Sequence, residues 1–175
     1  MDVVETTDLG QYFIAIIKGH PGDLAWYEDG KDRGDYIIGR KGLTKYYLLH
    51  GKKMSDLLNK SKLAELTDDT FGDDNLFLDL PLLPGKKYGD PEQVARPDNA
   101  YSWFVESARR VSLNATKGLS PHPTVIEYEL RFHTNPDHEV IKFVDGVGIT
   151  GFKYVHHGTV SETDLRLIEF HNGVD

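Results

Sequence analysis

The sequence predicts a mainly β protein, an antiparallel meander that curves into a barrel or half-barrel, with one short helix. Three observations support this: short apolar runs alternate with turn dipeptides, a helical period occurs in only one stretch, and strands do not alternate with helices as in parallel sheets. The chain has 175 residues, which is enough for one compact core. No linker-like stretch divides it, so we expect a single β-rich domain over residues 1–175.

The first part of the chain is expected to form successive hairpins. Apolar runs are separated by Pro21-Gly22, Asp29-Gly30 and Lys41-Gly42, which are typical turn pairs. The strands expected between them are 12–17, 24–28, 35–40 and 43–49. The helix is expected over residues 55–66, because Ser55 is a suitable N-cap and Asp56 suits the first turn.

The middle of the chain is expected to return to strand structure after an irregular stretch. The stretch 76–85 is expected to form an edge strand that runs into a polyproline-like corner, because Pro81 and Pro84 have no N–H to donate to a ladder. Residues 85–99 are polar and contain Gly89, Pro91 and Pro97, so we expect the longest loop there. Strands follow at 101–112 and 124–133. The second of these alternates cleanly between apolar and charged residues, as a half-exposed strand does.

The last forty residues are expected to form a three-stranded meander over 139–144, 149–157 and 164–171. Asp145-Gly146 marks the first turn, and residues 158–163 form the second. This arrangement places several histidines on neighbouring strands.

Composition excludes several kinds of site and partner. The chain has no cysteine, which excludes disulfides, thiolate zinc sites and thiol nucleophiles. Its net charge of −8 and pI of about 5.4 argue against a nucleic-acid partner. No apolar run is long enough for a transmembrane segment, and the first ten residues lack the features of a signal peptide. We expect a bacterial periplasmic or cell-surface location if an export signal was removed, and a cytoplasmic one otherwise.

Three stretches resemble a group of uncharacterised bacterial β-rich proteins, many of them lipoproteins. These stretches are 80–92 (LPLLPGKKYGDPE), 103–107 (WFVES) and 146–162 (GVGITGFKYVHHGTVSE). The resemblance covers about residues 76–171 and implies a β-rich fold, often outside the cytoplasm. The family has no established activity to transfer, and this chain lacks the cysteine that a lipoprotein anchor requires.

The candidate catalytic residues are His156, His157, Glu162 and Asp164. If the last two strands pair through a turn near Ser161, residue 156 lies opposite 164 and residue 157 opposite 163. The candidate His–carboxylate pair is His156 with Asp164 or His157 with Glu162. A carboxylate beside an imidazole can orient it as a general base, but such a pair is also an ordinary cross-strand contact. No nucleophile motif accompanies the pair. Local pairing does not bring the histidines together, so no metal site is predicted.

No cofactor is predicted, because the chain has neither a Walker A sequence nor a complete dinucleotide fingerprint. Glu127 and Glu129 share a strand face with Arg131. They fit either a catalytic acid pair or, more simply, a charged surface.

Aromatic residues are the candidates for ligand contact, because a curved sheet with inward aromatic rings can enclose an apolar cavity. The residues expected there are Trp26, Tyr47, Tyr101, Trp103, Tyr128 and Tyr154.

Together these features favour a non-enzymatic binding or structural domain that holds a small apolar or amphipathic ligand, or a protein partner. One alternative is a small hydrolase or lyase that uses a His–carboxylate pair, with or without a metal. Another is an interaction module that adds a partner strand at a sheet edge.

Overall fold

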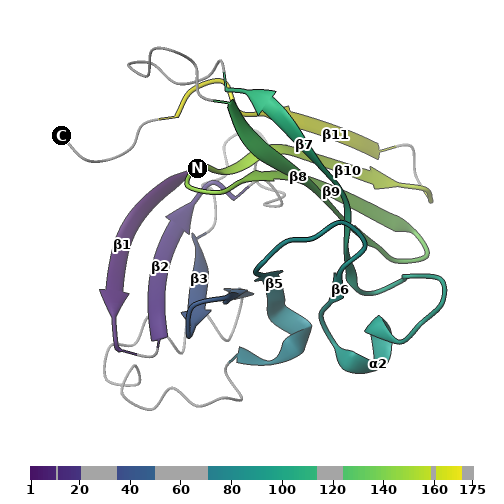
Figure 1. Cartoon of the computed structure of the whole chain (residues 1–175), viewed down its shortest axis with the longest axis horizontal. Coiled ribbons are helices and arrows are strands. Elements are labelled where there is room, and N and C mark those ends of the chain that lie inside the picture. The colour runs from purple at the N-terminus through teal and green to yellow at the C-terminus, as the bar shows by residue number, and fades with distance from the viewer. Residues whose placement is uncertain (11, 21–34, 50–70, 114–123, 159–160, 171–175) are drawn as a thin grey trace. The chain divides into compact units, whose positions relative to one another are not determined.

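A computed structural model describes residues 1–10, 12–20, 35–49, 71–113, 124–158 and 161–170 of the chain (Figure 1). Its regular structure is mainly β, in two antiparallel sheets, which confirms the predicted class. The chain divides into two compact units. The first comprises Met1–Pro81 with Tyr88–Pro91, and the second comprises Leu82–Lys87 with Glu92–Asp175. The expectation of a single domain stays a prediction.

The first sheet contains five strands in chain order. They are β1 (Asp2–Asp8), β2 (Tyr12–Lys18), β3 (Asp35–Lys41), β4 (Lys45–Leu49) and β5 (Leu76–Asp79). A short 3-10 helix, η4 (Asp73–Asn75), precedes β5. As predicted from Pro81, β5 is an edge strand, pairing only with β4 among the described strands. Strand β1 was not predicted, because nearly all of its residues are exposed and no apolar alternation marks it.

Aromatic and branched side chains form the core of the first unit. Ile17, Ile37 and Leu49 are almost completely buried. The Phe71 ring stacks on Tyr12 with 5.0 Å between ring centroids and meets the edge of Tyr47 at 5.3 Å. Tyr47 is therefore part of the packed interior.

The second sheet contains six strands, also in chain order. They are β6 (Lys87–Tyr88), β7 (Trp103–Ser112), β8 (Thr124–His133), β9 (Asp137–Val144), β10 (Gly148–His156) and β11 (Ser161–Arg166). Strands β7 to β11 lie side by side as a twisted sheet (Figure 1). The predicted C-terminal meander is confirmed, but β11 begins at Ser161, three residues before the expected start.

Some predicted elements differ from the structure or lie outside its described part. The region expected to be the longest loop contains β6 and the short helix α2 (Pro91–Val94). The helix predicted over 55–66 and the strand over 24–28 lie outside the described residues. Neither sheet closes on itself through the strands that are described, so the barrel or half-barrel stays a prediction. In the described parts of the chain, no helix has the length and apolar character to cross a membrane.

Candidate functional site

The pairing of β7 to β11 sets buried and charged rows of side chains beside each other. One row runs Val105, Leu130, Ile141 and Phe152 across the four strands β7 to β10, and each of these residues is at most 3% exposed. The next row consists of Ser107, Glu129, Lys142, Gly151 and Arg166. Because successive residues of a strand point to opposite faces, the buried row and the ionic row lie on opposite faces of this sheet.

The ionic face is hollowed into a groove of about 690 Å³, lined by residues of β7 to β11 and the segments that follow β7, β10 and β11. Its lining combines cations, carboxylates, histidines and apolar side chains. The cations are Arg109, Arg131, Lys142, Lys153 and Arg166, and the carboxylates are Glu127, Glu129 and Asp164. The histidines are His138 and His157, and the apolar residues are Val111, Leu113, Val140, Phe152, Val155, Leu165 and Leu167.

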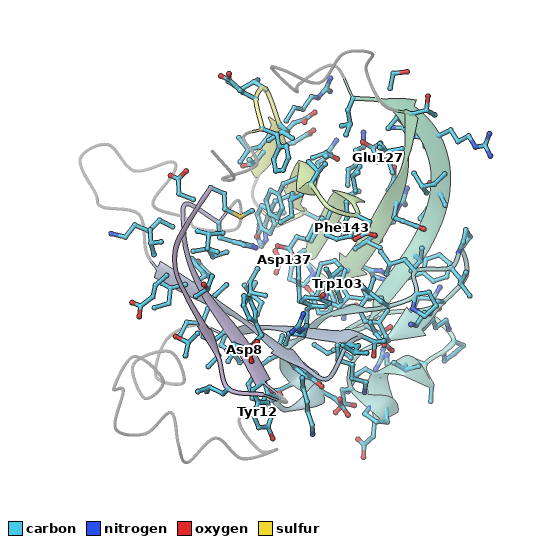
Figure 2. All side chains as sticks on the ribbon, turned by 60° about the vertical axis from the view of Figure 1, so that its left-hand side comes forward. Asp8, Tyr12, Trp103, Glu127, Asp137 and Phe143 are labelled. Atoms are coloured by element: carbon cyan, nitrogen blue, oxygen red, sulfur yellow. The ribbon has the colours of Figure 1, made fainter. Side chains whose placement is uncertain are left out.

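Glu127 is the most firmly held carboxylate of the groove. Its Oε1 accepts hydrogen bonds from Arg109 Nη2 at 2.7 Å and Nε at 3.0 Å, and its Oε2 accepts one from the Thr150 hydroxyl at 3.1 Å. The Glu127 side chain, which projects from β8 in the upper part of Figure 2, is only 12% exposed. The charge-assisted bonds raise the pKa of Arg109 further, so its guanidinium stays charged.

The other arginines and Lys153 also hold carboxylates. Arg131 Nη2 lies 3.3 Å from Glu129 Oε1, Lys153 Nζ lies 2.6 Å from Glu162 Oε1, and Arg166 Nη2 lies 3.2 Å from Asp164 Oδ2. Glu127 and Glu129 are thus each bound by an arginine, in agreement with a charged surface. These pairs fix the positions of the charges along the groove.

Lys142 is different, because no carboxylate of the described residues lies within ion-pair distance of its ammonium group. It is half-buried at the middle of the groove, on β9. Its aliphatic stem lies over Gly151: a Cβ placed on that glycine would be 3.2 Å from Lys142 Cδ. The missing side chain at position 151 therefore makes room for the lysine.

A separate polar cluster surrounds Asp137, near the centre of Figure 2. Asp137 Oδ1 lies 2.6 Å from His156 Nδ1 and accepts the Tyr154 hydroxyl at 2.7 Å. The hydrogen bond from His156, followed by that from Tyr154, lowers the pKa of Asp137, and the bond to Asp137 raises the pKa of Tyr154 to about 12. This carboxylate holds the imidazole in one orientation.

Glu139 lies on the same side of the sheet as Asp137, because the two residues are two positions apart on β9. Glu139 stands opposite Tyr154, and Asp137 stands opposite His156. Burial, helped by the charge of Asp137, raises the pKa of Glu139 to about 7. Sequence reasoning missed both acids. The Asp145-Gly146 turn alone could not have revealed them, because an irregularity between Ile149 and Gly151 shifts the register of β9 and β10 by one residue and so brings residue 137 opposite 156.

The expected pairing of His156 with Asp164 is wrong. His156 lies opposite Ser161, because the turn between β10 and β11 is shorter than expected. Glu162 and Asp164 point to the other face, where they bind Lys153 and Arg166, and the latter bond lowers the pKa of Asp164. The roles of His156, His157, Glu162 and Asp164 in catalysis stay predictions.

His157 joins a row of three histidines at one end of the groove face. The ring of His138 stacks on that of His133 at 5.2 Å between centroids and meets the edge of the His157 ring at 4.6 Å. Burial, and then the nearby His157 and His133, lower the pKa of His138. Within the described ranges no three His, Asp or Glu side chains are arranged to hold a metal ion.

The aromatic residues expected to contact a ligand do not line the groove. Tyr47 is buried in the first unit, and Trp103 packs on Phe132 at 5.3 Å. Tyr101 lies under Arg96, and Tyr128 is a half-buried neighbour of Phe143. Tyr154 binds Asp137 as described above, and Trp26 lies outside the described residues. The apolar part of the groove comes instead from valines and leucines together with Phe152, which composition alone did not single out.

No protein-family model, curated protein or solved structure matches this chain. The likeness to bacterial lipoprotein-like proteins and the location inferred from it stay predictions.

Proposed function

We propose that this protein is a non-enzymatic binding domain and that the groove on β7 to β11 holds a small amphipathic ligand. The observation that carries the proposal is the groove itself. Its volume of about 690 Å³ lies in the range of small-molecule sites, about 300–1,000 Å³. Its lining offers both apolar side chains and charges held in place by ion pairs.

The position of the groove on a sheet also supports binding. Its lining residues stand on hydrogen-bonded strands, so little conformational entropy is lost when a ligand orders them. We also propose that this sheet curves toward a half-barrel, because a curved sheet presents a concave face to a ligand.

Binding is tested by thermal unfolding with medium-chain amphiphiles, both charged and neutral, below their critical micelle concentrations. A ligand at about tenfold its Kd stabilises the folded state by about 1.4 kcal/mol. For a chain of this size the expected rise in Tm is about 3–5 °C. Val140→Glu, which places a carboxylate among the apolar groove residues, should abolish the rise.

Leu43→Glu is the matched control, because Leu43 is exposed and belongs to the other unit. It adds the same charge and should leave the ligand-induced rise intact. The proposal fails if no amphiphile changes the Tm of the wild-type protein, or if both variants respond alike. A protein segment in the groove or a strand added at a sheet edge would then become the stronger candidate.

A second candidate function is favoured by one observation, the bond between Asp137 and His156. With its proton on Nδ1, His156 would have an acceptor Nε2. A Cβ on Gly158 would lie 2.7 Å from that atom, so the glycine leaves Nε2 room. In hydrolysis, Nε2 would take a proton from water as the water oxygen adds to an ester carbonyl. The imidazolium would then return the proton to the departing alkoxide, giving an acid and an alcohol.

Hydrolysis of p-nitrophenyl acetate tests this candidate. His156→Ala should lower the rate at least tenfold, since general-base catalysis contributes about 10²–10⁴-fold. Asp137→Asn should also lower it and shift its pH profile, because Asp137 is a positioning residue. His157→Ala, on the other face, is the control. Equal rates in wild type and His156→Ala would remove the candidate.

A further inference from the structure

We infer that the ligand of the groove carries an acidic head group and that this group pairs with the ammonium of Lys142. The inference rests on the proposed function, because it names the chemistry of the ligand held in the same groove. Three features of the described residues support it: the position of Lys142, its lack of a carboxylate partner, and the apolar side chains beside it.

Position is the first feature. Lys142 stands on β9, the middle strand of the five that line the groove, between Glu129 of β8 and Gly151 of β10. Because Gly151 has no side chain, the lysine stem lies over it. The ammonium is therefore directed over the β10 side of the floor. Its charge contributes to the lowered pKa of Asp164 on β11.

The second feature is the balance of charges. Each other cation of the groove has a carboxylate: Arg109 has Glu127, Arg131 has Glu129, Lys153 has Glu162 and Arg166 has Asp164. Glu129, which stands opposite Lys142 on β8, and Asp164, on which the charge of Lys142 acts, are thus already bound by arginines. Among the described residues of the groove, Lys142 is the cation left without a carboxylate.

Lys142 is half-buried as a residue, and its ammonium has no ion-pair counter-charge among the described residues. A ligand carboxylate would supply that charge through charge-assisted hydrogen bonds. The chain as a whole has a net charge of −8, which would repel anions. An anion-binding position is therefore to be expected only where cations are concentrated, as they are around Lys142.

The third feature is the apolar surface along the same strand. On the groove side of β9, Val140 lies between Lys142 and His138. Val155 lies on the adjacent strand, β10. The distance along β9 from Lys142 to His138 is about 14 Å, at about 3.4 Å per residue. A medium-length aliphatic tail would fit over this stretch with its acid group at Lys142.

Isothermal titration with decanoate and with decanol, each below its critical micelle or solubility limit at pH 7.5, tests the inference. The tails match and only decanoate is ionised at that pH. Wild-type protein should bind decanoate at least tenfold more tightly than decanol. Lys142→Met, which keeps the apolar stem, should weaken decanoate binding about tenfold and leave decanol binding unchanged.

Two further variants complete the test. Lys142→Arg keeps the charge and should retain most of the affinity for decanoate. Lys45→Met removes a lysine from the first sheet and should have no effect. If decanoate and decanol bind equally, or if Lys142→Met binds decanoate as wild type does, the inference is wrong and the binding function stands. If neither compound binds the wild-type protein, this inference and the proposed binding of such amphiphiles are both wrong.

Discussion

Gly39 shows how a single residue in a strand can control packing. It lies on β3, and a Cβ at this position would overlap the edge of the Phe71 ring. That ring cannot easily move, because Tyr12 stacks on one part of it and Tyr47 contacts another. The close approach was not predictable from the sequence, since Phe71 is far from Gly39 along the chain and neither residue type indicates the contact.

Gly39→Ala should therefore destabilise the protein, by about 1–3 kcal/mol, as overpacking of a core usually does. Urea unfolding monitored by circular dichroism measures the change. In a Phe71→Leu background the same substitution should cost clearly less, because the smaller side chain relieves the overlap. An unchanged cost in both backgrounds would show that the ring is not the obstacle.

At the scale of elements, the ends of β8, β9 and β10 bring His133, His138 and His157 into one row. Arg131 adds a positive charge beside them, and Asp137 is the nearby anion that acts on His138 in the opposite sense. Protonation of the His138 ring is opposed by burial and by its neighbours. The row therefore makes folding sensitive to mildly acidic pH.

His138 has a lowered pKa in the folded state, so the unfolded chain takes up its proton first as the pH falls. Its neutral form supports folding fully above about pH 6.5, the ordinary pKa of histidine. That contribution is lost as the pH falls from there toward the folded-state pKa. Wild type should accordingly lose more stability than His138→Gln between pH 7.5 and pH 5, as urea unfolding would measure.

Glu139 acts in the opposite direction over part of this window. Its pKa is raised to about 7, so the folded protein keeps its proton while the unfolded chain releases it above about pH 4.5. The effect of His138 is isolated by comparing the single variant Glu139→Gln with the double variant Glu139→Gln/His138→Gln. A constant difference between them across the pH range would contradict the predicted effect.

For the whole molecule, the positions of strands were predictable where apolar and charged side chains alternate. Strand β8 has the predicted bounds, 124–133, because Ile126, Tyr128, Leu130 and Phe132 alternate with charged residues. Turn pairs such as Asp145-Gly146 and Lys41-Gly42 also placed the hairpins correctly, and both glycines adopt the positive φ that such turns favour.

What could not be predicted depends on register. The groove exists because Glu129, Lys142 and Gly151 fall in one row across three strands, and a shift of one residue would turn them to opposite faces. The His156 neighbour was predicted wrongly for the same reason, since the length of one turn decides whether residue 161 or 164 stands opposite it. Alternation within a strand tells which residues share a face, but not what lies across from them.

The chain-order arrangement of β7 to β11 has an evolutionary consequence. Every residue that lines the groove falls between Arg109 and Leu167, in one uninterrupted stretch of the polypeptide. A single recombination event that copied this stretch would carry the complete set of contacts into another gene. Duplication followed by divergence of the same stretch could then generate paralogues with different preferences while preserving the hairpins that support them.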